Sequence, residues 1–133
     1  MSQFLTTLRF EKIGARRWLL VDELVYQTNL LSGVIVAPRG FQTDLASIPR
    51  IFWTTFPKED LYDQAAVIHD AAYAHALTTT DGTRIELVKV WADKIFQEAM
   101  LASGVNQLQA NIMYRLVSWF GQPSRHPLAL NLS

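Results

Sequence analysis

Short apolar runs alternate with polar stretches over the first third of the chain. Residues 18–21, 24–26 and 34–36 are rich in Val, Leu, Ile, Trp and Tyr and are separated by polar or Gly residues. Runs of this length and composition predict strands, and Gly14-Ala15 predicts a turn between the first two strands of the β-leaning segment over residues 3–28. We therefore expect a small antiparallel sheet, followed by an irregular loop over residues 38–57, which contain three prolines.

The pattern changes to helical periodicity after this loop. Residues 58 to about 77 lack Gly and Pro and are rich in Ala. Residues 83–102 have apolar positions at helical spacing, and they open with Thr83 and Glu86, the spacing of a capping box that satisfies first-turn amides. We expect this second helix to end at Gly104, because glycine adopts the backbone conformation that terminates helices.

A third helix is predicted over residues 106–120, ending at Gly121. Its larger apolar residues share one stripe: Leu108, Ile112, Leu116 and Trp119. We expect the four tryptophans to lie mostly in the core, and residues 122–133 to form an extended or partner-bound tail. The chain is thus predicted to be a single α+β domain over residues 1–133, with a β-rich part and loop (1–57) beside a helical core (58–121).

Composition narrows the class of protein. The chain has 133 residues, of which 50% are hydrophobic and 18% charged, and it has no cysteine. Overall disorder and a disulfide scaffold are therefore excluded. Twelve Lys and Arg balance twelve Asp and Glu, so long-range attraction to nucleic acid is not expected. A neutral, apolar chain favours assembly, including a homo-oligomer.

The sequence predicts neither a signal peptide nor a spanning helix. Its first residues contain no basic segment followed by a long apolar run, and no stretch reaches the roughly 18 apolar residues that a spanning helix needs. We therefore expect synthesis in a cytoplasm.

The first two predicted helices carry the candidate chemistry. His69 and Asp70 are adjacent within an Ala-rich helix, so their side chains point about 100° apart and can do different work. Small residues three and four positions from His69 share its face and allow a second helix to approach: Ala65, Ala66 and Ala72. The next helix places Asp93 in an apolar segment, where it can face His69, and Tyr73 can reach the same carboxylate.

This grouping suits hydrolysis by an activated water. A neutral imidazole is a good general base near pH 7, and a carboxylate such as Asp93 would fix its tautomer. Asp70 would be left to bind a hard cation, which would stabilise a developing oxyanion. A metal-dependent phosphohydrolase ranks lower, because no histidine precedes His69.

Eleven residues around His69 resemble the catalytic helix of phospholipase A2. That family has the pattern D-x-C-C-x-x-H-D-x-C-Y, and residues 63–73 read D-Q-A-A-V-I-H-D-A-A-Y. Residues 92–96, A-D-K-I-F, resemble the segment that supplies the family's His-orienting Asp, and the cysteine-free phospholipase domain of parvovirus capsids is similar in style. The resemblance implies a phospholipase A2-like helical core, His69, Asp93 and Tyr73 as catalytic residues, and Ca²⁺ as cofactor.

A second resemblance covers more of the chain. The segment G-F-Q-T-D-L-A-S-I-P-R at residues 40–50, the His-Asp helix and A-D-x-x-F-x-x-A-M at 92–100 look like a family of small proteins from tailed phages and prophages. This resemblance implies a virion or tail-assembly setting in a bacterial host, with tail or baseplate proteins as partners. It implies no particular activity.

The sequence departs from phospholipase A2 ahead of the catalytic helix. The family's glycine-rich Ca²⁺ loop has no counterpart near residues 49–53. Either Asp44 and the loop over 43–47 supply replacement oxygens, or the metal site is lost. Asp44 and Ser47 also suit an Asx-type turn before Pro49.

Two functions follow from these patterns. The first is a phage-encoded, phospholipase A2-like ester hydrolase carried on the tail, acting on lipid or other acyl esters of the host envelope. Here Phe52-Trp53 and Phe56 would form an apolar rim that meets lipid. The second is a non-enzymatic tail or baseplate protein, or an assembly factor, in which His69 and Asp93 only hold two helices together.

Overall fold

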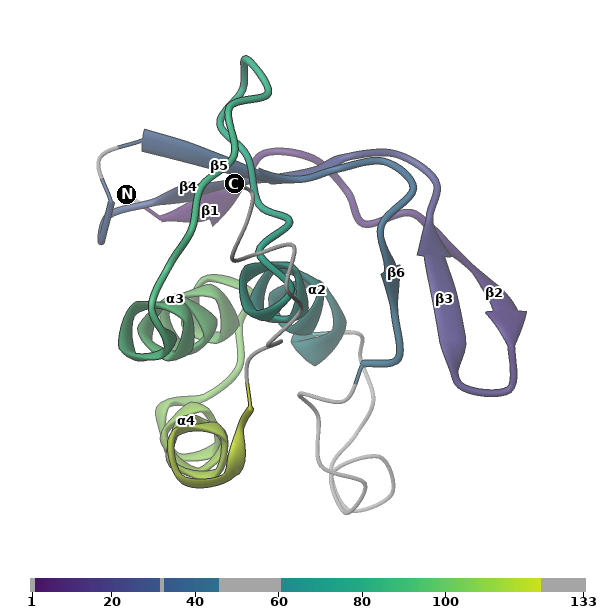
Figure 1. The fold of residues 1–133 in the computed structure, drawn as a ribbon. Helices are drawn as coiled ribbons and strands as arrows, with labels where there is room; N and C mark the ends of the chain where they lie inside the picture. The colour runs from purple at the N-terminus through teal and green to yellow at the C-terminus, as the bar shows by residue number, and fades with distance from the viewer. Residues whose placement is uncertain (1, 32, 46–60, 123–133) are drawn as a thin grey trace.

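The computed structural model describes residues 2–31, 33–45 and 61–122. Within these ranges six strands precede three helices, as expected for the α+β class (Figure 1). The strands are β1 (Gln3–Phe4), β2 (Phe10–Gly14), β3 (Arg17–Leu20), β4 (Leu24–Thr28), β5 (Gly33–Ala37) and β6 (Gln42–Thr43). The helices are α2 (Leu61–Tyr73), α3 (Lys89–Ala102) and α4 (Gln107–Phe120). Within the ranges described, no helix is long and apolar enough to span a membrane.

The strands divide between two antiparallel, three-stranded sheets. One has the order β1-β4-β5 and the other β2-β3-β6. Strand β4 shows the alternation of a strand with one buried face, because Leu24, Tyr26 and Thr28 are buried while the residues between them are only partly covered. The first sheet therefore supplies the wall against which the helices pack.

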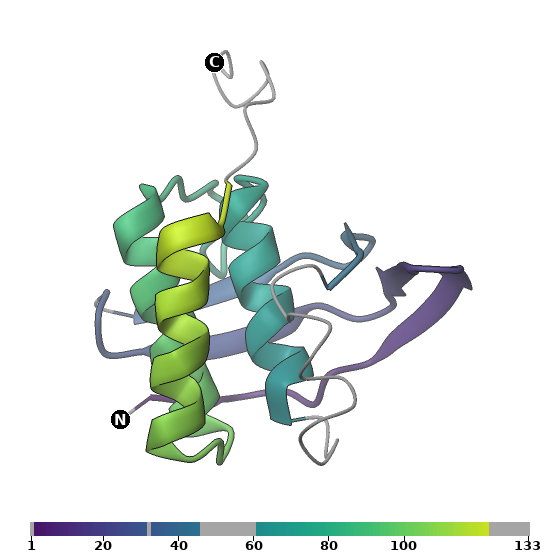
Figure 2. The same ribbon diagram turned by 90° about the horizontal axis from the view of Figure 1, so that it is seen from below.

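The helices form two layers beneath this wall. Helices α2 and α3 lie side by side under the β1-β4-β5 sheet, and α4 packs against α3 on the side away from the sheet (Figures 1 and 2). The alanines on the His69 face of α2 are fully or almost fully buried: Ala65, Ala66 and Ala72. Their small side chains bring α2 and α3 close together, as the sequence predicts.

The predicted start of the second helix is wrong. Helix α3 begins at Lys89 with Val88 as its N-cap, and within the described chain Val88 makes no side-chain cap hydrogen bond. Residues 83–87 are instead extended, because Ile85 N donates to Leu77 O (2.8 Å) and Thr79 N donates to Thr83 O (2.8 Å). Backbone pairing with the preceding segment outweighs the capping-box spacing of Thr83.

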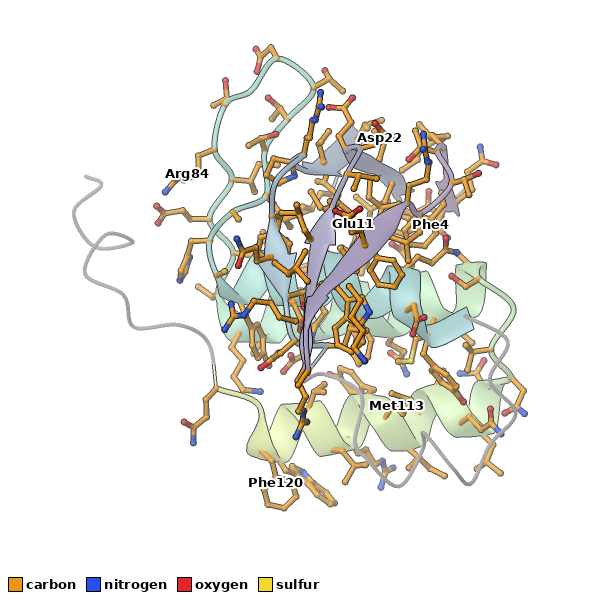
Figure 3. The ribbon with its side chains drawn as sticks, turned by 90° about the vertical axis from the view of Figure 1, so that its right-hand side faces the viewer. Phe4, Glu11, Asp22, Arg84, Met113 and Phe120 are labelled. Atoms are coloured by element: carbon orange, nitrogen blue, oxygen red, sulfur yellow. The ribbon has the colours of Figure 1, made fainter. Side chains whose placement is uncertain are left out.

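The buried face of α4 also differs from the expectation. Asn106 caps the helix by accepting from Gln109 N (2.9 Å), but the buried positions are Ala110, Met113 and Val117. Three residues of the predicted stripe are exposed, since Leu108 is 69%, Ile112 38% and Trp119 67% exposed. Only Leu116 of that stripe packs, partly buried, against the core. Figure 3 shows Met113 on the side of α4 that faces the other helices and Phe120 on the side that faces away.

Candidate functional site

His69 and Asp93 meet between α2 and α3. The His69 Nε2 atom lies 2.7 Å from Asp93 Oδ1, and the two residues are only 1% and 2% exposed. The imidazole stacks on Phe96, with ring centroids 4.5 Å apart. The structure therefore brings together the two side chains that the sequence paired, inside the core of the helical layer.

Tyr73 completes the predicted group. It lies one helical turn after His69, and its hydroxyl donates to Asp93 Oδ1 at 2.5 Å. Its ring centroid is 4.1 Å from that of His69. One oxygen of the Asp93 carboxylate therefore faces both His69 and Tyr73.

Lys89 is a fourth member that the sequence analysis missed. Its Nζ donates to Asp93 Oδ2 at 2.6 Å, to Val117 O at 2.7 Å and to Ser118 O at 3.1 Å. A Lys four residues from an Asp on one helix is a recognisable signal for such a pair. The backbone acceptors at the end of α4 had no signal in the sequence.

These contacts set the ionisation of the group. Burial alone would raise the pKa of Asp93, but hydrogen bonds from His69, Lys89 and Tyr73 together hold that pKa below its usual value. Burial, with the nearby Asp93 carboxylate, raises the pKa of Tyr73. At neutral pH the group therefore contains an Asp93 carboxylate and a neutral Tyr73. Because a carboxylate can only accept, Nε2 of His69 is the donor in its hydrogen bond with Asp93.

Asp70 lies on the other side of α2, at a pocket of about 340 Å³. The hydroxyl of Thr43 in β6 donates to Asp70 Oδ2 and accepts from Leu45 N at 3.0 Å. Leu45 has a positive φ of 56°, a left-handed conformation that is costly for leucine. Thr43 thus fixes strand β6 against α2 and holds the backbone of Leu45 beside it.

The pocket contains some of the predicted site residues and not others. Its described lining is Arg17, Phe41, Gln42, Thr43, Asp44, Asp70, Tyr73, Ala74 and Gln122. Asp44 and Asp70, the predicted cation ligands, therefore share one pocket, and Tyr73 connects it to the buried group. His69 and Asp93 are not among these lining residues.

The donors at this pocket fit a hard cation in type but are few. Asp44 and Asp70 offer carboxylate oxygens, which Ca²⁺ prefers. Among the described residues, no three His, Cys, Asp or Glu side chains form a group that could hold a metal ion. Some residues of the predicted loop and apolar rim lie outside the described residues. These are Ser47, Pro49, Phe52, Trp53 and Phe56.

Fold and site together define an α+β protein with a buried His–Asp–Tyr–Lys group between two helices and an acidic pocket beside it. The chain belongs to the family described as Protein of unknown function (DUF1353), whose model matches residues 18–117. The matched segment includes His69, Asp93, Tyr73 and Lys89, and it ends at Val117. Comparisons with curated proteins and with solved structures found no match.

Proposed function

We propose that this protein is an ester hydrolase in which His69 activates a water molecule and Asp93 orients His69, as in phospholipase A2. The observation that carries the proposal is the 2.7 Å hydrogen bond between His69 Nε2 and the buried Asp93 carboxylate. It is supported by Tyr73 and Lys89, which hold both oxygens of that carboxylate. Fixing the tautomer through Nε2 makes Nδ1 the nitrogen that accepts a proton.

The proposed reaction is a general-base hydrolysis. Nδ1 of His69 takes a proton from water as the water oxygen forms a bond to the ester carbonyl carbon. The resulting imidazolium is stabilised by Asp93. It then returns the proton to the leaving alkoxide as the ester carbon–oxygen bond breaks, which leaves an acid and an alcohol.

Asp70 and Asp44 are the proposed ligands of a divalent cation, with Ca²⁺ as the candidate because both donors are oxygens. When bound, such an ion would polarise the ester carbonyl. The support for this part is that both carboxylates line one pocket.

We further propose a substrate and a setting. The substrate would be a lipid ester or another acyl ester of a bacterial envelope, and the protein would act on the tail of a phage, bound to tail or baseplate proteins. The support is the resemblance of residues 40–50 and 92–100 to proteins of tailed phages.

The test is release of fatty acid from phosphatidylglycerol vesicles, measured with Ca²⁺ and with a chelator. We expect release by the unaltered protein, its loss in His69→Gln and Asp93→Asn, and its retention in His75→Gln. His75 is a matched control, because it follows the same helix and lies outside the group. No release by the unaltered protein, or equal release by His69→Gln, would remove the hydrolase proposal. Fatty acid release that continues in the presence of the chelator would contradict only the proposed role of the divalent cation.

A second candidate function is favoured by two observations. The His69 imidazole is 1% exposed, and α4 presents Leu108, Trp119 and Phe120 to solvent. A tail or baseplate structural protein, or an assembly factor with a relic site, would bury its histidine and bind a partner through such an apolar face. Mass spectrometry of purified virions tests the structural version, and absence of the chain from particles would count against it.

A further inference from the structure

Lys89 joins three parts of the molecule at one atom. It is the first residue of α3, and its Nζ reaches the Asp93 carboxylate and the carbonyls of Val117 and Ser118 at the end of α4. An ammonium group has three N–H donors, so these three acceptors use all of them. The side chain is 29% exposed, and it also lies over the Tyr73 ring at 5.9 Å from the centroid.

The two oxygens of Asp93 have different partners. Oδ1 accepts from His69 and Tyr73, and Oδ2 accepts from Lys89. A carboxylate held only through Oδ1 could rotate about its terminal bond, which has a broad torsional preference. Lys89 therefore fixes the plane of the carboxylate and, with it, the direction of the acceptor that His69 faces.

The other end of this contact is the last turn of α4. The final carbonyls of a helix carry partial negative charge, so a cation is stabilised there; Val117 O accepts from Lys89 in addition to its backbone hydrogen bond from Gly121 N at 2.8 Å. The chain then passes directly over Tyr73 at Gly121, where an added Cβ would clash with the Tyr73 hydroxyl and lie 2.6 Å from Val117 O. The end of α4 thus contacts the buried group twice, through Lys89 and through Tyr73.

We propose that Lys89 is a positioning residue that couples the end of α4 to the orientation of Asp93 and, through Asp93, to His69. Its effect on turnover rests on the proposed hydrolase function, whereas its effect on the hydrogen bond between His69 and Asp93 does not. Displacing the last turn of α4 would accordingly weaken that hydrogen bond even though α4 contributes no side chain to it.

The test is proton and nitrogen NMR of the His69 ring at pH 7, in the unaltered chain and in Lys89→Met, Lys89→Arg and Lys94→Met. We expect Lys89→Met to move the His69 Nε2–H resonance upfield and to speed its exchange with water about tenfold, the equivalent of one charge-assisted hydrogen bond. Lys89→Arg should restore most of the shift. Lys94→Met is the matched control, because Lys94 is exposed on the same helix and lies over the Trp91 ring.

Gly121→Ala provides a second variant that disturbs the end of α4 and leaves Lys89 in place. We expect the His69 resonance to move in the same direction as in Lys89→Met. If the unaltered protein hydrolyses ester, Lys89→Met should also lower kcat about tenfold with little change in KM. An unchanged His69 resonance in both folded variants would overturn the proposal. A wild-type chain without esterase activity would remove only the hydrolase, because the resonance tests Lys89 independently.

Discussion

Asp93 is the residue on which the buried group depends. Removing a carboxylate from water is costly, and an unpaired buried charge is strongly destabilising. Here donors from α2 and α3, namely His69, Tyr73 and Lys89, share the two oxygens. The charge is therefore retained in the core because three donors replace its hydration.

Asp93→Asn should destabilise the protein by about 3 kcal/mol, because His69, Tyr73 and Lys89 would lose the negatively charged acceptor of their hydrogen bonds. Because the pKa of Asp93 is lowered by folding, its contribution is present above the ordinary carboxyl pKa of about 3.9 and is lost as the pH falls through the folded value. Urea unfolding from pH 7 to pH 3 should show a smaller loss of stability in Asp93→Asn than in the unaltered chain. Equal losses would contradict the assignment.

Gly121 is required for space and not for backbone conformation. Its φ is −67°, which any residue can adopt. Gly121→Ala should nevertheless cost about 1–3 kcal/mol, the usual range for overpacking, because the new methyl group would clash with Tyr73 and Val117. Thermal unfolding checks this, with Gly14→Ala as the control, since a Cβ there meets its nearest atom at an ordinary 3.6 Å. Equal losses in the two variants would contradict the steric explanation.

At the scale of elements, the apolar periodicity predicted whether a segment is a helix or a strand better than it predicted where a helix begins or which of its faces is buried. Strands β3, β4 and β5 and the three described helices were predicted because their apolar residues form regular runs, whereas β6 lies inside the predicted loop over residues 38–57. The start of α3 was not, because Thr83 and Ile85 also suit an extended segment that pairs with residues 77–79. The buried face of α4 was missed because two stripes share the helical period, and the one with smaller residues allows closer contact with α3.

The extended segment before α3 gives a prediction about its turn. Asp81 accepts from both Thr79 and Thr83, and these hydrogen bonds lower its pKa to about 2. Asp81→Ala should therefore lower the melting temperature at neutral pH. Glu86→Ala, which would break a capping box, should change stability by less than about 0.5 kcal/mol, as for an ordinary surface residue. A larger loss in Glu86→Ala than in Asp81→Ala would support a helical start at Thr83.

At the scale of the whole molecule, Glu98 connects the helical layer to the sheet. Its carboxylate on α3 accepts from Tyr26 Oη (2.7 Å), Thr28 Oγ1 (2.7 Å) and Asn29 N (3.1 Å) at the end of β4. Tyr26 and Thr28 are buried. The contact joins residues about 70 positions apart in the chain, so it fixes the position of α3 relative to strand β4.

Glu98→Ala should cost about 1–3 kcal/mol, because it leaves buried hydroxyl donors without their acceptor. Glu23→Ala, at an exposed position just before β4, should stay within about 0.5 kcal/mol. Denaturant unfolding of both variants measures the difference. Similar midpoints for the two would show that the contact contributes nothing to the docking of α3 on the sheet.

The parts of the site that could be predicted are those fixed by local spacing. His69 and Tyr73 share a helix face, and an Asp in an apolar segment of the next helix needs a buried partner. Lys89 could be paired with Asp93 by its spacing, but its carbonyl acceptors depend on where α4 ends in space. The contact between Thr43 and Asp70 likewise depends on the placement of β6, which has no periodic signal in two residues.

Because Lys89 donates to the carbonyls of Val117 and Ser118, a fragment that keeps the geometry of the buried group must extend to the end of α4. A two-helix fragment over residues 61–102 would carry each ionisable side chain of the buried group and still leave the lysine with one of its three acceptors. Transferring the His-Asp motif to another pair of helices would therefore reproduce the sequence of the motif but not its geometry. The recipient would also need a third helix whose last carbonyls accept from the lysine ammonium group.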